Sequence, residues 1–324
     1  MASSTAAALS VAPIVFSARG LKLDVRLQVF DKIFHVHSTI LKLHSAYFFK
    51  FLDPANAAPV ADPAPGSFPY EWVTKVDMDG LWYLVASSDK SLDLGRREDC
   101  TKEIRLEENA FEMLLKAMYN RSFFITEFQQ LLAVANLADY YLARPILSAS
   151  LSAALCRSPN LIFMILDNNC EMLILAESFR CDWLFRKSFA LSLGPFHDPV
   201  IKKLPDAPVR SLAERKYMAL QSQVLDAQAA IMQVGIGAYP YNNGILFPRT
   251  ANGVLSWPQY FRAIGPGKIA VRNLDVDTRT KDLLRNTLDF DDGHVSGVGR
   301  FKEHFLCVEV SDDELPWDTA ETDF

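Results

Sequence analysis

Two histidines that lie two residues apart are the first candidates for chemistry. His35 and His37 belong to the segment 33–37, whose alternating apolar residues predict a strand. On a strand both imidazoles share one face, so both could ligate one metal ion. The sequence offers no third ligand at a suitable spacing, and we therefore expect neither a metal nor a cofactor.

The five cysteines follow no pattern of metal ligands or disulfides. None forms a C-x-x-C pair, and none has a histidine at ligand spacing. Three of them lie in apolar helical contexts, where a thiol behaves as a small hydrophobe. This usage suits a reducing compartment, either the cytosol or the nucleus. The cysteines are Cys100, Cys156, Cys170, Cys181 and Cys307.

The motifs of catalysis are equally incomplete. Asp77 and Asp79 lie in a predicted turn, where aspartate is common because it bonds to the local backbone. His197 lies in a proline-flanked loop without a serine or cysteine in a nucleophile elbow. Lys268 follows Gly-Pro-Gly but precedes isoleucine, so it does not complete a phosphate loop. We therefore predict no catalytic residue and no enzymatic activity.

An enzyme with its site in residues 235–318 stays open as an alternative. This stretch holds His294 and His304 together with several acids, and the sequence does not reveal its architecture. The alternative requires that these side chains converge in a pocket.

The elements that must position such residues begin with a hairpin. Residues 24–30 and 33–37 alternate apolar and polar side chains around a short turn. Ser38 is expected to cap the first of two short helices that extend to Leu52. Residues 53–67 contain four prolines and predict a loop inserted in the domain.

A second hairpin is predicted from residues 71–76 and 81–86. Residues 102–106 are expected to form a short strand, and Glu107 to Asn109 to begin a helix, because acids favour a helix N-terminus. Apolar residues then recur at helical spacing as far as Ile231. The helices are expected at residues 123–142, 145–155, 161–166, 170–179, 182–193 and 209–233.

The longest of these helices carries a heptad seam that is too short for a free coiled coil. We expect it to dock on its own domain. The seam consists of Ala213, Tyr217, Leu220, Val224, Ala227 and Ile231. In residues 235–308 we predict no architecture beyond short strands near 268–271 and 305–310.

The composition is that of a globular protein with about two domains. The chain has 324 residues, 50% of them hydrophobic, and a net charge of -6, which leaves no basic surplus for nucleic acid. No stretch approaches the ~18 apolar residues of a membrane span, so no membrane is expected as a partner. Residues 309–324 hold seven acids and no base, which predicts a solvated, disordered tail. Residues 1–20 are expected to form an arm that is flexible or partly packed.

The order of these elements, together with particular residues, resembles the BTB/POZ family in its fungal form. The resemblance rests on Asp24-Val-x-Leu27, Phe34-x-Val-His37, Leu41-x-x-x-Ser45-x-Tyr-Phe48, the strand and helix around Ile104 to Met118, and Leu137-Ala-Asp-Tyr140. The helices that follow are similar to the extension called BACK.

The resemblance implies an α+β fold. A small mixed sheet flanked by helices would occupy residues 21–155, and a mainly α-helical BACK-like region residues 156–234. In the first of these, residues 53–67 would lie outside the core. The side chains expected to be buried there are Phe30, Phe34, Val36, Leu41, Phe48, Leu114, Leu131 and Leu137.

The resemblance also implies a protein-interaction module or adaptor without catalysis. BTB domains form homodimers and serve in transcriptional regulators, in channel assembly and as adaptors of cullin-type ubiquitin ligases. His37 falls on a family motif, where its role is structural. Ser38 stands where the transcriptional subtype has a basic residue, which argues against co-repressor binding. We expect only weak self-association, because residues 1–20 offer few apolar anchors.

A substrate adaptor of a cullin-type ubiquitin ligase is the second alternative. Cullin-binding members carry a hydrophobic-x-acid pattern before this helix, and Leu106, Glu107 and Glu108 resemble it. An apolar anchor and a carboxylate at an exposed helix start would suit a basic groove on the partner. Acids at helix starts are also favoured for dipole reasons alone.

Overall fold

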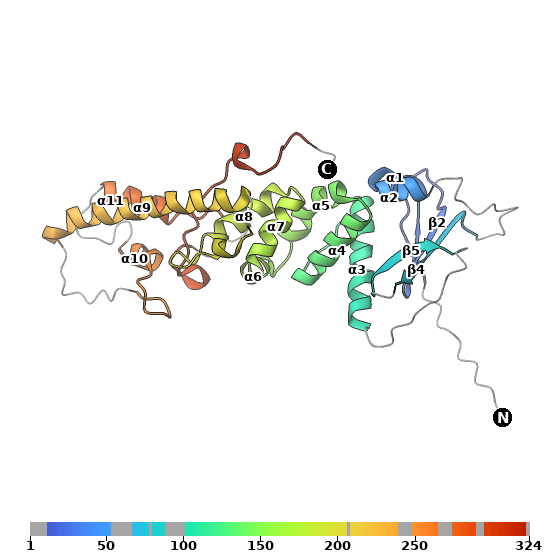
Figure 1. Cartoon of the computed structure of the whole chain (residues 1–324), viewed down its shortest axis with the longest axis horizontal. Helices are drawn as coiled ribbons and strands as arrows, with labels where there is room; N and C mark the ends of the chain where they lie inside the picture. The colour runs from blue at the N-terminus through green and yellow to red at the C-terminus, as the bar shows by residue number, and fades with distance from the viewer. Residues whose placement is uncertain are drawn as a thin grey trace, which may run out of the picture. The chain divides into compact units, whose positions relative to one another are not determined.

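The chain forms an α+β structure that is mostly helical (Figure 1). The structure is a computed structural model, and it describes residues 12–52, 67–77, 80–87, 101–205, 208–238, 248–264, 274–289 and 295–321. These ranges contain a five-stranded mixed sheet and eleven α-helices. The chain divides into two units, residues 1–159 and residues 160–323. The α+β class is confirmed, and the predicted loop at 53–67 lies outside the described residues except for Ser67.

The sheet belongs to the first unit and contains both predicted hairpins. Strands β2 (Val25–Val29) and β3 (Lys32–Val36) pair antiparallel, as do β4 (Tyr70–Val76) and β5 (Trp82–Ala86). Strands β2 and β4 join the hairpins in parallel. Strand β1 (Ile14–Val15) adds a parallel edge to β3, so the order is β1-β3-β2-β4-β5.

Strand β1 shows that residues 12–20 are a packed arm and not a flexible one. The ring of Phe16 is 1% exposed and packs between Phe34 and Tyr119. The guanidinium of Arg121 lies 4.8 Å from the centre of the Phe16 ring, within the range of a cation–π contact. Two strand residues are too few to show the alternation on which a sequence prediction of a strand depends.

Five helices complete the described part of the first unit. They are α1 (Ser38–His44), α2 (Ala46–Phe51), α3 (Thr101–Met118), α4 (Phe128–Tyr140) and α5 (Arg144–Cys156). The expectation that Ser38 caps a helix is wrong, because Ser38 is the first residue of α1 and donates from its backbone and hydroxyl to Asp24. Ser45 caps the next helix, α2, since its side-chain oxygen accepts from the Phe48 backbone at 3.1 Å.

The strand predicted at residues 102–106 is wrong, because helix α3 already begins at Thr101. The helix start expected near Asn109 is therefore about two turns too late. Ile104 and Leu106 alternate with polar residues, but the segment consists of good helix formers and continues into the buried face of α3.

An aromatic core fills the space between one face of the sheet and its helices. The rings of Phe48 and Tyr141 stack with centres 5.2 Å apart, and Phe111 packs edge-on against Tyr141. Of the residues expected in this core, those buried as predicted are Phe34, Val36, Leu41, Phe48, Leu114, Leu131 and Leu137. Phe30 is only half-buried, which corrects its prediction. It lies in the hairpin turn with a φ of 48°, where it leaves the alternation of the strand.

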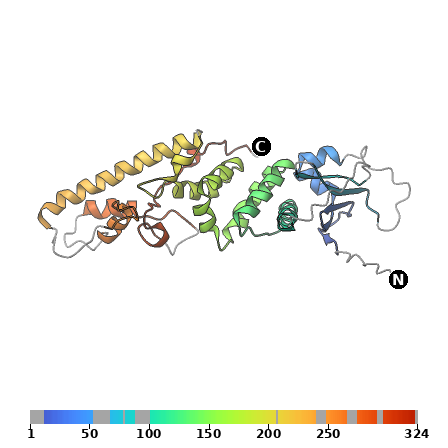
Figure 2. The same ribbon diagram turned by 60° about the horizontal axis from the view of Figure 1, so that its bottom comes forward.

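The second unit consists of helices and extended segments. Its α-helices are α6 (Leu161–Asp167), α7 (Asn169–Ser178), α8 (Asp182–Ser192), α9 (Pro208–Ala238), α10 (Trp257–Ile264) and α11 (Leu274–Leu283). Helices α6 to α9 confirm the predictions for these ranges. Figure 2 shows α10 and α11 alongside the long helix α9.

The seam of α9 docks on its own unit, as predicted. Val224 and Ala227 are buried in a core that also takes Phe261 from α10 and Val276 from α11. Residues 305–310 are not the strand that we expected. They form an extended segment, in which the Leu306 carbonyl accepts the Thr287 backbone N–H at 2.9 Å. The strand expected at 268–271 lies outside the described residues.

The acidic C-terminal segment, residues 309–321, is packed and not a disordered tail. Val310 and Leu315 are buried, and the ring of Trp317 meets Phe185 of α8 edge-on at 5.2 Å. A short 3-10 helix, η4 (Asp312–Glu314), lies between them. The prediction was wrong because it considered only the charge of the segment. Three apolar residues that pack against the unit stand among the acids, and the cations that pair with these acids are distant in the sequence.

Candidate functional site

The residues predicted to bind a cullin lie inside α3 and not at its start. Glu108 is 6% exposed, and its Oε1 accepts the backbone N–H of Asp31 at 2.9 Å. The Oε2 of Glu107 accepts from the Trp82 indole at 3.0 Å, and burial raises the pKa of Glu107. Leu106 is half-buried. These three residues therefore do not form the exposed helix start that the expectation required. Cullin binding stays a prediction.

The histidine pair packs within the first unit. The ring of His35 lies 4.4 Å from that of Phe68, and burial lowers the pKa of His35. His37 is buried, and its Nδ1 is 2.8 Å from the hydroxyl of Tyr119. In the part of the chain that the structure describes, no group of three or more His, Cys, Asp or Glu side chains is placed to hold a metal ion.

A second pair of histidines bears on the enzyme alternative. His304 is buried against Gly194 so closely that a Cβ at this glycine would lie 2.1 Å from the imidazole. Burial, and secondly the charge of His197, lower the pKa of His304 to about 4. His197 itself lies 3.7 Å from the carboxylate of Glu303. Such tight packing is typical of a structural histidine, and His294 lies outside the described residues.

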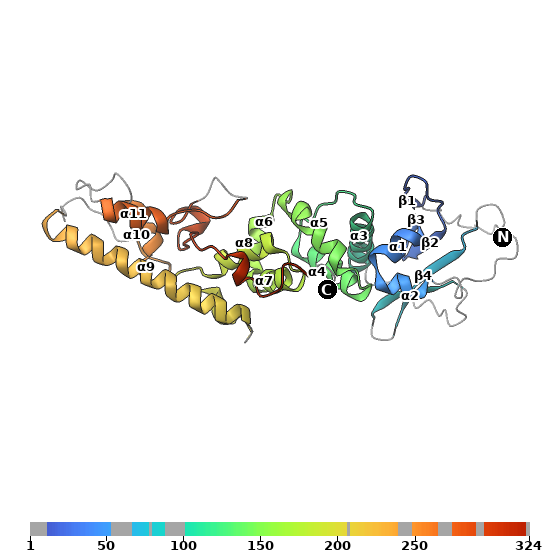
Figure 3. The same cartoon turned by 90° about the horizontal axis from the view of Figure 1, so that it is seen from above.

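The first unit carries an exposed apolar surface, which we call the docking patch. Its five side chains are between 40% and 74% exposed, although all are large and apolar or aromatic. They come from α1, from α2, from the last residue of α4 and from the turn that follows it. Figure 3 shows α1 and α2 side by side next to the sheet. The docking patch consists of Leu43, Phe49, Phe51, Tyr140 and Leu142.

Backbone and ring contacts connect part of the docking patch to helix α2. The carbonyl of Leu142 accepts the backbone N–H of Ala46, the first residue of α2, at 3.3 Å. Phe49 is one turn further along α2, on the same face as Ala46. The ring of Tyr47 lies between two other members of the docking patch, with ring centres 4.7 Å from Phe51 and 5.7 Å from Tyr140.

The charges of α1 and α2 are all of one sign. Lys42, His44 and Lys50 lie on these helices, which contain no acid. The ammonium of Lys50 lies 5.4 Å above the Phe51 ring, so a cation directly borders the docking patch. Burial lowers the pKa of His44, which leaves the two lysines as the positive rim at neutral pH.

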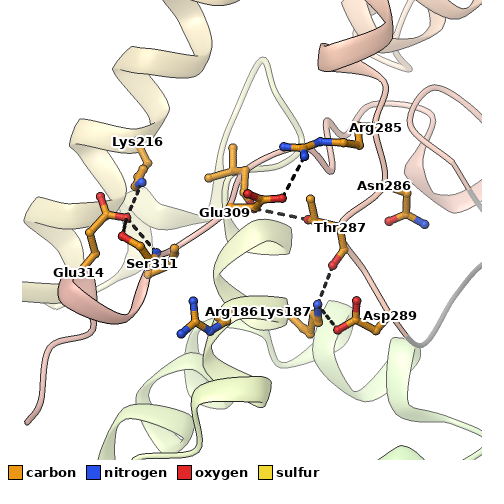
Figure 4. Close-up of a pocket in the computed structure, with 12 residues that line it drawn as sticks. Arg186, Lys187, Lys216, Arg285, Asn286, Thr287, Asp289, Glu309, Ser311 and Glu314 are labelled. Carbon is orange, nitrogen blue, oxygen red and sulfur yellow. Dashed lines mark hydrogen bonds and ion pairs between the residues drawn. The ribbon is translucent and has the colours of Figure 1, made fainter. Parts of the chain in front are cut away.

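The second unit contains a polar cavity of about 680 Å³ (Figure 4). Side chains from α8 and α9 line it together with two extended segments near residues 285–289 and 308–314. The ammonium of Lys187 is 2.6 Å from both the Thr287 carbonyl and the Asp289 carboxylate. The basic side chains of the lining are Arg186, Lys187, Lys216 and Arg285, and the acidic ones are Asp289, Glu309 and Glu314.

The length and hydropathy of the described helices bear on whether one of them could span a membrane. No single one of them is long and apolar enough to cross a membrane. Helices α5 and α6 reach the required length and composition only when they are counted together across the break between them.

Comparisons with known proteins assign the chain to no family. No family model, no curated protein and no solved structure matches it. The BTB/POZ resemblance therefore stays an interpretation of the sequence. The geometry of the two units is the basis on which a function can be proposed.

Proposed function

We propose that the chain is a protein-interaction module of the BTB type, which binds a partner protein through the docking patch and performs no catalysis. The docking patch is the observation that supports this function. Large apolar side chains that are exposed together remain in unfavourable contact with water until a partner covers them. Groups of exposed apolar side chains mark interaction sites, and aromatic residues supply much of the binding energy there. We place this interaction in the cytosol or nucleus.

The charges around the docking patch select the class of partner. Lys42 and Lys50 lie on the helices that carry Leu43, Phe49 and Phe51, and these helices contain no acid. A second copy of the chain would bring these lysines against each other, which disfavours a symmetric dimer. The complementary occupant is a segment of another protein that has aromatic or aliphatic anchors flanked by Asp or Glu.

A peptide-display selection tests this function. The intact chain is used as bait for a random library of peptides about a dozen residues long. We expect enrichment of peptides with apolar anchors and acidic flanks. Phe49→Asp should abolish the enrichment, because it replaces a large apolar side chain of the docking patch, 69% exposed, with a charged one. Met218→Asp is the matched control, since Met218 is equally exposed on α9 of the other unit.

Charge reversal distinguishes specific binding at the docking patch from non-specific hydrophobic binding. The double variant Lys42→Glu, Lys50→Glu should select basic flanks in place of acidic ones. Enrichment of the same peptides by the unmodified chain and by Phe49→Asp would refute the proposal. Sedimentation at micromolar concentration supplies a further readout. A dimer that Phe49→Asp dissociates would show that a second copy occupies the docking patch, and the acid-flanked partner would then be wrong.

A further inference from the structure

The packed C-terminal segment carries an exposed serine hydroxyl at the cation-lined cavity. Ser311 lines this cavity, and its hydroxyl and backbone N–H both donate to Oε2 of Glu314, at 2.9 Å and 3.0 Å. The same carboxylate oxygen accepts from the ammonium of Lys216 at 2.6 Å (Figure 4). One carboxylate oxygen therefore connects the serine to a cation of α9.

The cavity has room and cations for a phosphoryl group. Its volume of about 680 Å³ is larger than one phosphoryl group needs, and four basic side chains line it. The pair between Arg285 and Glu309 has both side chains more than half exposed, so it is weak and exchangeable. A phosphate dianion offers about twice the charge of a carboxylate and three acceptor oxygens. Arginine and lysine form their strongest hydrogen bonds with such groups.

We propose that Ser311 is a phosphorylation site for an acidophilic serine kinase and that the resulting phosphate binds in the cavity. Three acids, Asp312, Asp313 and Glu314, follow the serine directly, and a kinase with a basic substrate groove recognises acids in these places. Ser311 and the first two acids are exposed, so the kinase can reach them.

The reaction is an ordinary phosphoryl transfer from ATP. The Ser311 oxygen forms a bond to the γ-phosphorus, and the bond from this phosphorus to the bridging oxygen breaks. ADP leaves with that electron pair, and the hydroxyl proton passes to a base of the kinase. The product is a phosphoserine at the edge of the cavity, beside Lys216.

The phosphate should fasten the C-terminal segment to α8 and α9. It takes over Lys216 from Glu314 and recruits Arg186, which now pairs with the exposed Asp312. Residues 309–321 then gain charge-assisted bonds without losing the buried anchors Val310 and Leu315. This inference does not rest on the proposed function, because Ser311 and the docking patch lie in different units.

Phosphorylation of the full chain by an acidophilic serine kinase, with the site mapped by mass spectrometry, tests the first half of the inference. We expect phosphate on Ser311 and its loss in Ser311→Ala. Thr319→Ala is the matched control, because Thr319 is exposed in the same segment but has no acid at the next position. Phosphorylation elsewhere with Ser311 unmodified would overturn the proposed site.

Two readouts test whether the phosphate binds in the cavity. Phosphorus NMR should give the phosphoserine a pKa below its ordinary value of about 6, and Lys216→Gln should raise that pKa again. Hydrogen exchange of residues 309–321 should become at least severalfold slower on phosphorylation. Lys202→Gln, which changes an exposed lysine outside the cavity lining, should alter neither readout. An ordinary phosphoserine pKa with unchanged or faster exchange would contradict binding in the cavity.

Discussion

Glu108 is a residue whose role the sequence motif and the structure assign differently. The motif suggested an exposed partner contact, whereas the structure gives it a buried carboxylate that accepts the N–H of Asp31 in the β2–β3 turn. We expect Glu108→Ala to destabilise the first unit by about 1 to 3 kcal/mol, because the N–H loses a charged acceptor inside the protein. Urea denaturation measures this. Glu103→Ala, at an exposed position of the same helix, should change stability by less than about 0.5 kcal/mol. Equal losses would contradict the assignment.

His304 should make the stability of the second unit depend on pH. Its folded pKa is about 4, below the ordinary 6.5, so the unfolded chain binds this proton first as the pH falls. The contribution of neutral His304 to the free energy of unfolding is therefore complete above pH 6.5. It falls as the pH drops from 6.5 to 4, and the loss reaches about 3 kcal/mol at pH 4. In His304→Phe this slope should disappear, whatever the variant's stability at neutral pH. Denaturation at several pH values decides, and parallel slopes for the two proteins would sink the prediction.

Local sequence patterns predict a helix or strand correctly where the residues it packs against are close in the sequence. The two hairpins and helices α6 to α9 repeat their apolar residues over several periods, so the sequence predicts them. The start of α3 and the packing of residues 309–321 depend on contacts with distant segments. The Trp82 indole and the Asp31 backbone N–H donate hydrogen bonds to the carboxylates of α3. Helices α8 and α9 supply the cations that pair with the acids of the C-terminal segment.

The docking patch could not be predicted for a similar reason. Phe48 and Phe49 are neighbours of the same type, yet one is buried and the other is mostly exposed. The difference arises because α2 turns only one side toward Tyr141 and the sheet. Helix α2 has only six residues, four of them aromatic, and such a short pattern does not show which face of the helix the core covers.

Glu314 fastens the C-terminal segment, and its charge is what makes the attachment depend on pH. The bond from Lys216, with two from Ser311, lowers the pKa of Glu314 to about 2. A lowered carboxyl pKa stabilises the folded state above the ordinary value of 4.5 and loses this effect as the pH falls toward 2. Glu314→Gln should therefore speed hydrogen exchange in residues 309–321 severalfold at neutral pH.

The neighbouring acid provides the control for Glu314. Asp313→Asn removes an equal charge from an exposed side chain of the same 3-10 helix and should leave the exchange rates nearly unchanged. Added salt should also weaken the attachment in the unmodified chain, because it screens exposed pairs such as Arg186 with Asp312. If both variants speed exchange equally, general charge and not the contact of Glu314 holds the segment.

At the scale of the whole molecule, each unit has its own core. The first is built around the aromatic cluster of Phe48, Phe111 and Tyr141, and the second around α9 with Phe261 and Phe305. A fragment of residues 1–159 should therefore fold alone with the circular dichroism of a mixed α+β protein. Glu108→Ala should lower its stability by the same amount as in the full chain. A fragment without secondary structure would contradict the independence of this unit.

Photo-crosslinking at residue 49 tests the proposal that the chain holds another protein at the docking patch. A photoreactive amino acid replaces Phe49 in the full chain in its native cell, and Met218 in a control protein. Mass spectrometry then maps the crosslinked residues. We predict adducts from residue 49, and not from residue 218, to segments of other proteins that combine apolar anchors with acidic flanks. Crosslinks only to a second copy of the chain, or to segments of any charge from both positions, would contradict the account.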